Sequence, residues 1–276
     1  MKTLEKIEKK IGLTEVLQKL VSNEIKIPIL DTFNLVSEYW YPHPPCLIPL
    51  FLGYGASYRG IIHHFFCNRK NTFVEFYLEN GYMSETSRTE KQLFTMMILD
   101  MIITEDKITS DILEFSERIQ YREVNDIYYF FNEYGDDSDE FNKLPYFKDK
   151  LPFENIEDLD DYNGDYPSSI YIANPLVIEK SSPFEVANLD FLKDIPNVPI
   201  WFDENIDKKE LFNQYIRENK LKEAWFTLNS KNWLLKDVAE ALNILKMKSD
   251  DELLHLVADN WIAGWRNSNA KDGDKY

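Results

Sequence analysis

The sequence predicts an α+β protein, with an antiparallel β-meander in the N-terminal half, flanking helices and a helical C-terminal third. Three β-like runs, 46–52, 58–66 and 72–79, are separated by glycine-containing or polar turns. Apolar residues recur at helical spacing before and after these runs. Apolar residues also make up 44% of the 276 residues, which is enough for a substantial core.

The first 45 residues are expected to be helical and then extended. Leu4, Ile7 and Ile11 recur at helical spacing, and Thr14 is the predicted N-cap of a second helix. The stretch 33–40 is compatible with a short helix or a strand. The proline-rich stretch 41–45 has to be extended or turning, because proline fixes φ and disfavours helix in the residue before it.

The β-meander is expected to turn at glycines. The stretch Gly53-Tyr54-Gly55 lacks the further residues of a phosphate-binding loop, so it is interpreted as a tight turn between two strands. Asn80-Gly81 is a strong turn signal after the third run.

Helices are expected after the meander and again in the last third. Ser87 and Glu90 have capping-box spacing, and Gly135 stands where a helix C-terminus needs glycine. Helical periodicity covers 93–101, 108–119 and 124–134, and later 211–216, 221–228, 238–245 and 253–264. The polar tail from Asn267 is expected to fray.

Two regions are expected along the chain. Residues 1–206 are predicted to form the α+β core, which includes an acidic, proline-rich segment, 136–206, with possible short strands at 169–172 and 176–178. Residues 207–276 are predicted to form a helical subdomain packed on that core.

The net charge of −17 is concentrated in the middle of the chain. Residues 1–103 carry 11 acidic and 11 basic side chains, and residues 207–276 carry 12 of each. Residues 104–206 carry 25 acidic and only 8 basic side chains. A balanced protein with one acidic third indicates a surface with a preferred, cationic partner.

Composition also disfavours several classes of function. The acidic balance disfavours nucleic-acid binding, and no apolar run is long enough to span a membrane. The charged N-terminus lacks the apolar region of a secretory signal, so the protein is expected in the cytoplasm with Cys46 and Cys67 reduced. No metal site or other cofactor is predicted. The turn 160–165 lacks ligating residues at the first and last positions of a calcium loop.

The sequence predicts no catalytic residue. His63 and His64, with a carboxylate or Cys67, keep a hydrolase open as an alternative. In a strand the two imidazoles would point to opposite faces, so one of them is expected in the core. A structural or scaffold protein that binds through exposed aromatic residues is a further alternative.

One stretch resembles a known family. From Pro42 to Phe66, a proline-rich start precedes an apolar LIPLFLGYG strand and turn, and RGIIHHFF follows. This order is similar to that of the SUKH superfamily, which is named for yeast cell-wall-synthesis regulators and bacterial immunity proteins, over about residues 20–85. The resemblance implies a non-enzymatic α+β domain that binds and neutralises a partner toxin, often a basic nuclease.

The sequence therefore predicts a binding protein, an immunity-type inhibitor that covers a basic toxin or nuclease with an acidic surface. Its oligomeric state is left open. The predicted partner-binding residues are the carboxylates and tyrosines of the acidic segment: Asp136, Asp137, Asp139, Glu140, Asp158, Asp160, Asp161, Tyr162, Asp165 and Tyr166.

Overall fold

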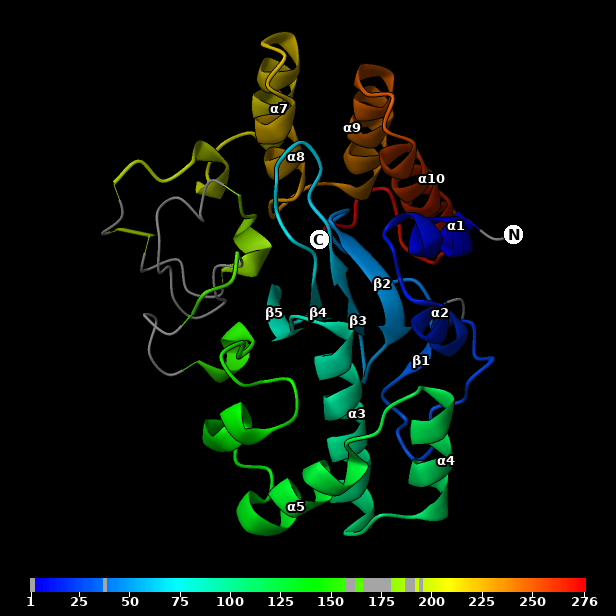
Figure 1. Cartoon of the computed structure of the whole chain (residues 1–276). Helices are drawn as coiled ribbons and strands as arrows, with labels where there is room; N and C mark the ends of the chain where they lie inside the picture. Colours follow the sequence, from blue (N-terminus) through cyan, green and yellow to red (C-terminus); the bar gives the residue numbers. More distant parts are fainter. Residues whose placement is uncertain (1–2, 37–38, 157–161, 166–179, 187–191, 194–195) are drawn as a thin grey trace.

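The computed structural model describes residues 3–36, 39–156, 162–165, 180–186, 192–193 and 196–276. A five-stranded antiparallel sheet lies at its centre, and helices pack against both faces of the sheet (Figure 1). The α+β class predicted from the sequence is confirmed.

The sheet consists of β1 (Asn34–Leu35), β2 (Leu47–Leu52), β3 (Ser57–Ile62), β4 (Thr72–Tyr77) and β5 (Tyr82–Ser87). The α-helices are α1 (Thr3–Lys10), α2 (Glu15–Val21), α3 (Glu90–Glu105), α4 (Ser110–Arg118), α5 (Val124–Tyr134), α7 (Lys208–Arg217), α8 (Leu221–Leu228), α9 (Leu235–Lys248) and α10 (Glu252–Arg266). Short 3₁₀ helices are η1 (Ser138–Lys143), η2 (Phe153–Asn155), η4 (Pro183–Glu185) and η6 (Ile200–Phe202).

The strands follow one another in the order β1-β2-β3-β4-β5, and each is antiparallel to the next. The pairing of β2 with β3 shifts between Pro49 and Phe51. A bulge there accommodates Pro49, which has no N–H to donate to the ladder. Gly60 lies opposite Pro49, and a Cβ on it would lie 2.4 Å from the carbonyl oxygen of Ile48. Only glycine therefore allows this close approach of β3 to β2.

Alternate residues of the strands face two separate parts of the core. Tyr58 and Phe76 point to one face, where they join Trp225 of α8 and Trp261 of α10. Phe51 and Ile61 point to the other face, which α2, α3, α4 and α5 cover. Burial on both sides explains why β2 is apolar throughout and does not alternate with polar residues.

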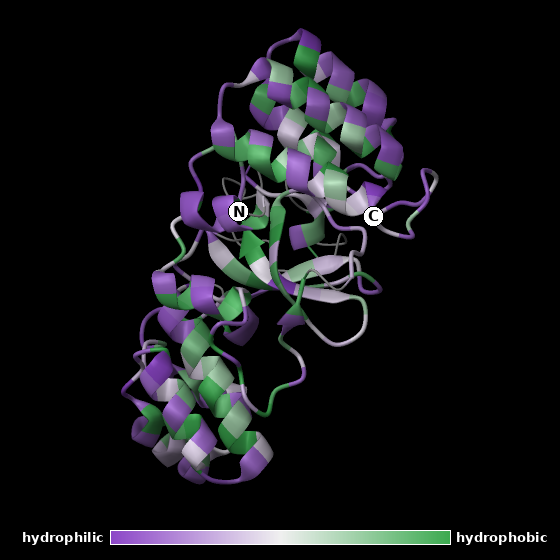
Figure 2. Ribbon diagram, turned by 90° about the vertical axis from the view of Figure 1, so that its right-hand side faces the viewer, coloured by the Kyte–Doolittle hydropathy of each residue, from purple (hydrophilic) through white to green (hydrophobic). Residues whose placement is uncertain are grey.

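The helices form two groups with the sheet between them. Helices α7 to α10 gather at one end of the molecule and α3 to α5 at the other (Figure 1). The helices carry polar and apolar residues side by side, and strongly apolar segments lie in the strands between them (Figure 2). Residues from before and after position 206 share one buried cluster, so the predicted regions 1–206 and 207–276 pack on each other through the core.

Several predicted boundaries differ in the structure. The stretch 33–40, left open between helix and strand, contains the short strand β1. The chain from 82 to 87 continues the meander as β5, so the predicted capping box of Ser87 and Glu90 is wrong. The N-cap of α3 is Thr89, whose hydroxyl accepts from the backbone N–H of Gln92. The possible strands at 169–172 and 176–178 lie outside the described residues.

The expectation that the tail frays from Asn267 is wrong. The tail returns to the body of the protein, where the Leu235 N–H donates to the Asp274 carbonyl at 2.9 Å and Leu234 pairs with Lys275. The Tyr276 ring is buried against Phe184 and Trp261, and its hydroxyl donates to the Leu228 carbonyl at 2.5 Å. Burial of one aromatic ring outweighs the polar composition of the residues before it.

Within the described ranges, no helix combines the length and the hydropathy needed to cross a bilayer.

The docking of the tail predicts that Tyr276→Ala lowers the free energy of unfolding by about 2–4 kcal/mol, because it removes a buried aromatic ring. Tyr276→Phe removes only the hydrogen bond to Leu228 and is expected to cost about 1 kcal/mol. Urea denaturation measures both. Lys275→Ala is the control, since Lys275 is exposed. Equal stability of Tyr276→Ala and the control would contradict the docking.

Candidate partner-binding site

Four of the predicted carboxylates form an acidic turn, which runs from the end of α5 into the first residues of η1 and comprises Asp136, Asp137, Asp139 and Glu140. Gly135 ends α5 with a positive φ of 68°, as its position in the sequence predicts. Asp136, Asp137 and Asp139 are exposed, and none of the three is ion-paired to another described residue. Glu140 is half-buried and pairs with Lys143 at 2.5 Å.

Of the other predicted residues, Tyr162 and Asp165 lie in the described part of the chain, and both contact distant segments. Tyr162 is half-buried, and its hydroxyl lies 3.3 Å from the buried carboxylate of Glu85 on β5. The Asp165 carboxylate accepts from the Lys70 N–H at 3.4 Å. Tyr162 is thus part of the packing against β5 rather than an exposed anchor. Asp158, Asp160, Asp161 and Tyr166 lie outside the described residues.

A cavity of about 390 Å³, here called the polar cavity, lies beside the acidic turn. Ser138 and Phe141 of η1 belong to its wall, so the turn and the cavity are continuous. The remaining lining residues come from the segment before β1, from β3, β4 and β5, from α3 and from η2: Phe33, Arg59, Glu75, Thr86, Ser87, Leu93, Met96, Asp100, Glu154 and Asn155.

Arg59 is the one basic residue among the described residues that line the polar cavity, and its guanidinium already has partners. Its Nε donates to Glu75 Oε1 at 3.2 Å, and its guanidinium carbon lies 4.4 Å from the centre of the Phe33 ring. Its Nη1 lies 3.4 Å from Thr32 Oγ1. Arg59 is therefore held by one carboxylate and one ring, and its single charge does not balance the three carboxyl groups of the wall, Glu75, Asp100 and Glu154.

Asp100 and Ser87 leave polar groups at the polar cavity without a partner. The Asp100 carboxyl makes no ion pair or hydrogen bond with a described residue, and burial raises its pKa to about 6. Glu75 nearby raises that pKa further, while Arg59 lowers it. The Ser87 hydroxyl is buried and has no hydrogen-bond partner in the described part of the chain. Such groups are energetically costly when they stay unpaired.

This wall can receive a cation. Glu75, Asp100 and Glu154 supply carboxylates, and Arg59 supplies the opposite charge. Met96, Phe33 and Phe141 supply apolar surface for the methylene groups of a lysine or arginine side chain. A guanidinium that donates to Asp100 would satisfy its carboxylate in a partly desolvated site, where charge-assisted hydrogen bonds are strong.

Sequence reasoning did not find the polar cavity. Arg59 and Glu75 lie on adjacent strands, opposite each other in the register. They lie on the face of the sheet that packs against α3, where apolar residues are expected. Asp100 interrupts the apolar run from Thr95 to Thr104, and this is the one signal in the sequence that marks the cavity. The pairing of strands, which brings these residues together, has no local signature.

His64 belongs to a buried network and has no access to solvent. The Trp225 indole N–H donates to His64 Nδ1 at 3.1 Å, so the proton of the neutral imidazole is on Nε2. Nε2 then donates to Glu185 Oε2 at 3.1 Å. Both side chains have zero exposed surface, and burial lowers the pKa of His64.

Arg69 supplies the charge that balances Glu185. The two side chains form a buried ion pair, and Arg69 Nη1 donates to the Lys180 carbonyl at 2.8 Å. The Ser182 N–H also donates to Glu185 Oε2, at 2.5 Å. Burial by itself would raise the pKa of Glu185, but Arg69 and His64 outweigh it and hold that pKa at about 2. The network fixes the segment 180–186 against β3 and α8.

The hydrolase alternative gains no support from this geometry. The two histidines do face different surroundings, as expected, although both follow the end of β3. His63 is half-buried and hydrogen-bonds to Asn71 at 2.9 Å. Burial raises the pKa of the Cys67 thiol, which disfavours a nucleophilic thiolate. Among the described residues, no three His, Cys, Asp or Glu side chains are grouped so that they could hold a metal ion.

No protein-family model, curated protein or solved structure matches this chain.

The buried network predicts a pH-dependent loss of stability for Glu185→Gln. At neutral pH the variant leaves Arg69 without its counter-charge, and the free energy of unfolding is expected to fall by about 3–5 kcal/mol. Glu185 has a pKa that is lower in the folded protein than in the unfolded chain, so its contribution is present above pH 4.5. The contribution is lost as the pH falls towards 2.

Urea denaturation at several pH values checks this. The gap between wild type and Glu185→Gln should be widest at neutral pH and should close in acid. Glu204→Gln, which changes an exposed carboxylate, is the control and should shift stability by less than about 0.5 kcal/mol. A gap that is constant with pH would show that the ionised carboxylate does not stabilise the fold.

Proposed function

We propose that this protein is a non-enzymatic binding protein of the immunity type, which neutralises a basic partner, a toxin or nuclease, through an acidic surface. The observation that carries the proposal is the acidic turn. Its first three carboxylates are exposed, lack counter-charges among the described residues, and adjoin a cavity whose own wall is acidic. The resemblance to the SUKH superfamily points in the same direction.

The acidic turn and the polar cavity would have different tasks. Exposed carboxylates act over several ångströms in water, so they speed the approach of a cationic surface and disfavour acidic competitors. The cavity would receive one lysine or arginine of the partner, close to Asp100. Desolvated charge pairs of this kind determine how slowly a complex dissociates.

A phosphate-like charge pattern gives the proposed inhibition a physical basis. Asp136, Asp137 and Asp139 place three carboxylates within four residues. A nuclease binds nucleic acid through arginine and lysine side chains that contact phosphates. A cluster of carboxylates at that cationic site would compete with the nucleic acid.

Affinity capture from cells of the source organism is the first experiment. A basic protein should be retained at low ionic strength and released at high ionic strength, because salt screens exposed charges. The captured protein is then purified, and its activity is titrated with the present protein. Stoichiometric inhibition supports the proposal. Retention of no basic protein, or retention that salt does not change, contradicts it.

The triple variant Asp136→Asn, Asp137→Asn, Asp139→Asn should weaken binding to the purified partner at least about tenfold, mainly through slower association. Asparagine keeps the side-chain oxygen with which Asp137 accepts from the Asp139 N–H, so the turn should stay intact. The matched control removes the same charge from exposed positions elsewhere: Glu204→Gln, Asp250→Asn and Asp272→Asn. Surface plasmon resonance measures both rates. An equal loss in the control would assign the effect to net charge alone.

Asp100→Asn tests the polar cavity separately. The substitution keeps the shape of the side chain and removes its charge, so the complex should dissociate faster while its association rate changes little. The stability of the free variant should not fall, because a carboxyl whose pKa is raised by burial is costly to ionise. An unchanged dissociation rate would show that no cation of the partner enters the cavity.

A further inference from the structure

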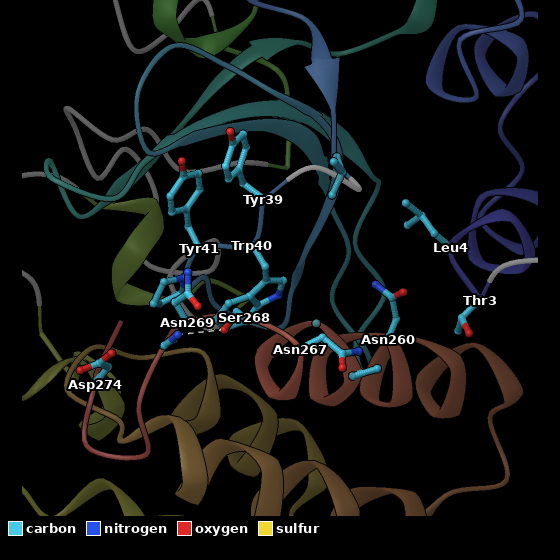
Figure 3. A pocket seen from close by; sticks show the side chains of 15 residues that line it. Thr3, Leu4, Tyr39, Trp40, Tyr41, Asn260, Asn267, Ser268, Asn269 and Asp274 are labelled. Carbon is cyan, nitrogen blue, oxygen red and sulfur yellow. Dashed lines mark hydrogen bonds between the residues drawn. The ribbon is translucent and has the colours of Figure 1, made fainter.

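We infer that an open groove between the segment 39–42, α10 and the C-terminal tail is a binding site for a neutral oligosaccharide. The groove has a volume of about 670 Å³, within the range of small-molecule sites. Thr3 and Leu4 of α1 line it together with the segment 39–42, Asn260 of α10 and residues of the C-terminal tail (Figure 3). It shares no residue with the acidic turn or the polar cavity.

One wall of the groove is aromatic. The rings of Tyr39 and Tyr41 are nearly parallel, with an angle of 17° between their planes and 6.4 Å between their centres. Tyr39 is 63% exposed, so much of its side chain is accessible to a ligand. In Figure 3 both side chains point to the same side of the segment. The C–H face of a sugar ring packs on such a flat apolar surface.

The floor of the groove is anchored to the core by several contacts. The Tyr58 hydroxyl accepts from the Tyr41 N–H at 2.6 Å and donates to the Tyr41 carbonyl at 3.1 Å. Trp40 packs edge-on against Trp261 and lies directly over Gly264. A Cβ at position 264 would lie 2.5 Å from the Trp40 ring, so only glycine leaves space for the indole there. A site held in place before binding loses little entropy when a ligand is bound.

The part of the groove formed by α10 and the tail carries polar groups without partners among the described residues. The side-chain amides of Asn260, Asn267 and Asn269 make no hydrogen bond to any described residue, and the same is true of the Trp40 indole N–H. Asn260 and Gly264 are four residues apart on α10 and therefore lie on the same side of the helix, and Asn267 is the residue that caps its C-terminus. Each amide offers both donors and an acceptor. Sugar hydroxyls have the same double capacity.

The charges of the groove exclude other ligands. Among the described residues that line it there is no lysine or arginine, and the one charged side chain among them is Asp274, so a phosphate-bearing ligand finds no counter-charge on this part of the chain. A proline-rich peptide offers carbonyl acceptors for the amide and indole N–H groups, but it has few donors for the amide oxygens or for the Asp274 carboxylate, of which one oxygen already accepts from the Lys271 N–H at 2.8 Å. A neutral ligand with many hydroxyl groups fits the aromatic wall, the amides and the carboxylate together.

Titration with a panel of neutral glycans tests the inference. The panel comprises cellotetraose, maltotetraose, mannotetraose and chitotetraose, and binding is followed by the indole N–H resonances in NMR spectra. At least one glycan should shift the Trp40 signal saturably. Tyr39→Ala should weaken that binding about tenfold or more, and Tyr129→Ala, which removes an equally exposed tyrosine on α5, should leave it unchanged.

Gly264→Ala provides a second variant, because it displaces the Trp40 ring and keeps every polar group. It should likewise weaken binding about tenfold or more, and circular dichroism checks that the variant is folded. A polyproline peptide and adenosine are titrated in parallel as other possible ligands. The inference is overturned if no glycan of the panel binds saturably, if Tyr39→Ala binds as tightly as wild type, or if only the polyproline peptide or adenosine shifts the Trp40 signal.

Discussion

Burial on both faces of the central sheet is the constraint on which the rest of the structure depends. A strand such as β2, which is apolar at every position, cannot leave either face in water. The chain covers one face with α2 to α5 and the other with α1, α8, α9 and α10. The tail and Tyr276 complete the second cover. Helices far apart in the sequence therefore become neighbours because they share the same apolar surface.

The same constraint explains why charged groups occur inside the fold. Where a loop closes over the sheet, polar side chains are buried with it, and each needs a partner. His64, Arg69 and Glu185 provide partners for one another across more than a hundred residues of sequence. Such a network contributes little net stability compared with an apolar core, but it connects the segment 180–186 to the chain after β3 and to α8.

Two candidate binding regions lie where loops and helices complete the cover of the sheet. The acidic turn and the polar cavity lie where η1 and α3 meet the edge of the sheet. The groove between the segment 39–42, α10 and the C-terminal tail lies near α1, at the end of the molecule where α7 to α10 gather (Figure 1). Since they share no residue, a basic protein and a neutral glycan would not compete for the same side chains.

Periodicity and turn chemistry determined much of the fold from the sequence alone. Strands β2 to β4, the helices from α3 to α5 and the four C-terminal helices follow from local patterns, since hydrophobic spacing and glycines act over a few residues, whereas β1 was left open and β5 was not predicted. The excess of carboxylates in residues 104–206 is likewise a property of the sequence. It predicted the acidic turn but not which carboxylates would remain without a counter-charge.

The tertiary structure alone decided the rest, because the relevant contacts join residues distant in sequence. Arg59, Glu75 and Asp100 meet only when two strands pair and α3 packs on them. Trp40 and Gly264 meet across more than two hundred residues. The polar tail docks because Tyr276 finds a place between Phe184 and Trp261. No local sequence pattern encodes these contacts. They depend on which apolar surfaces of the whole chain still need to be covered by another element.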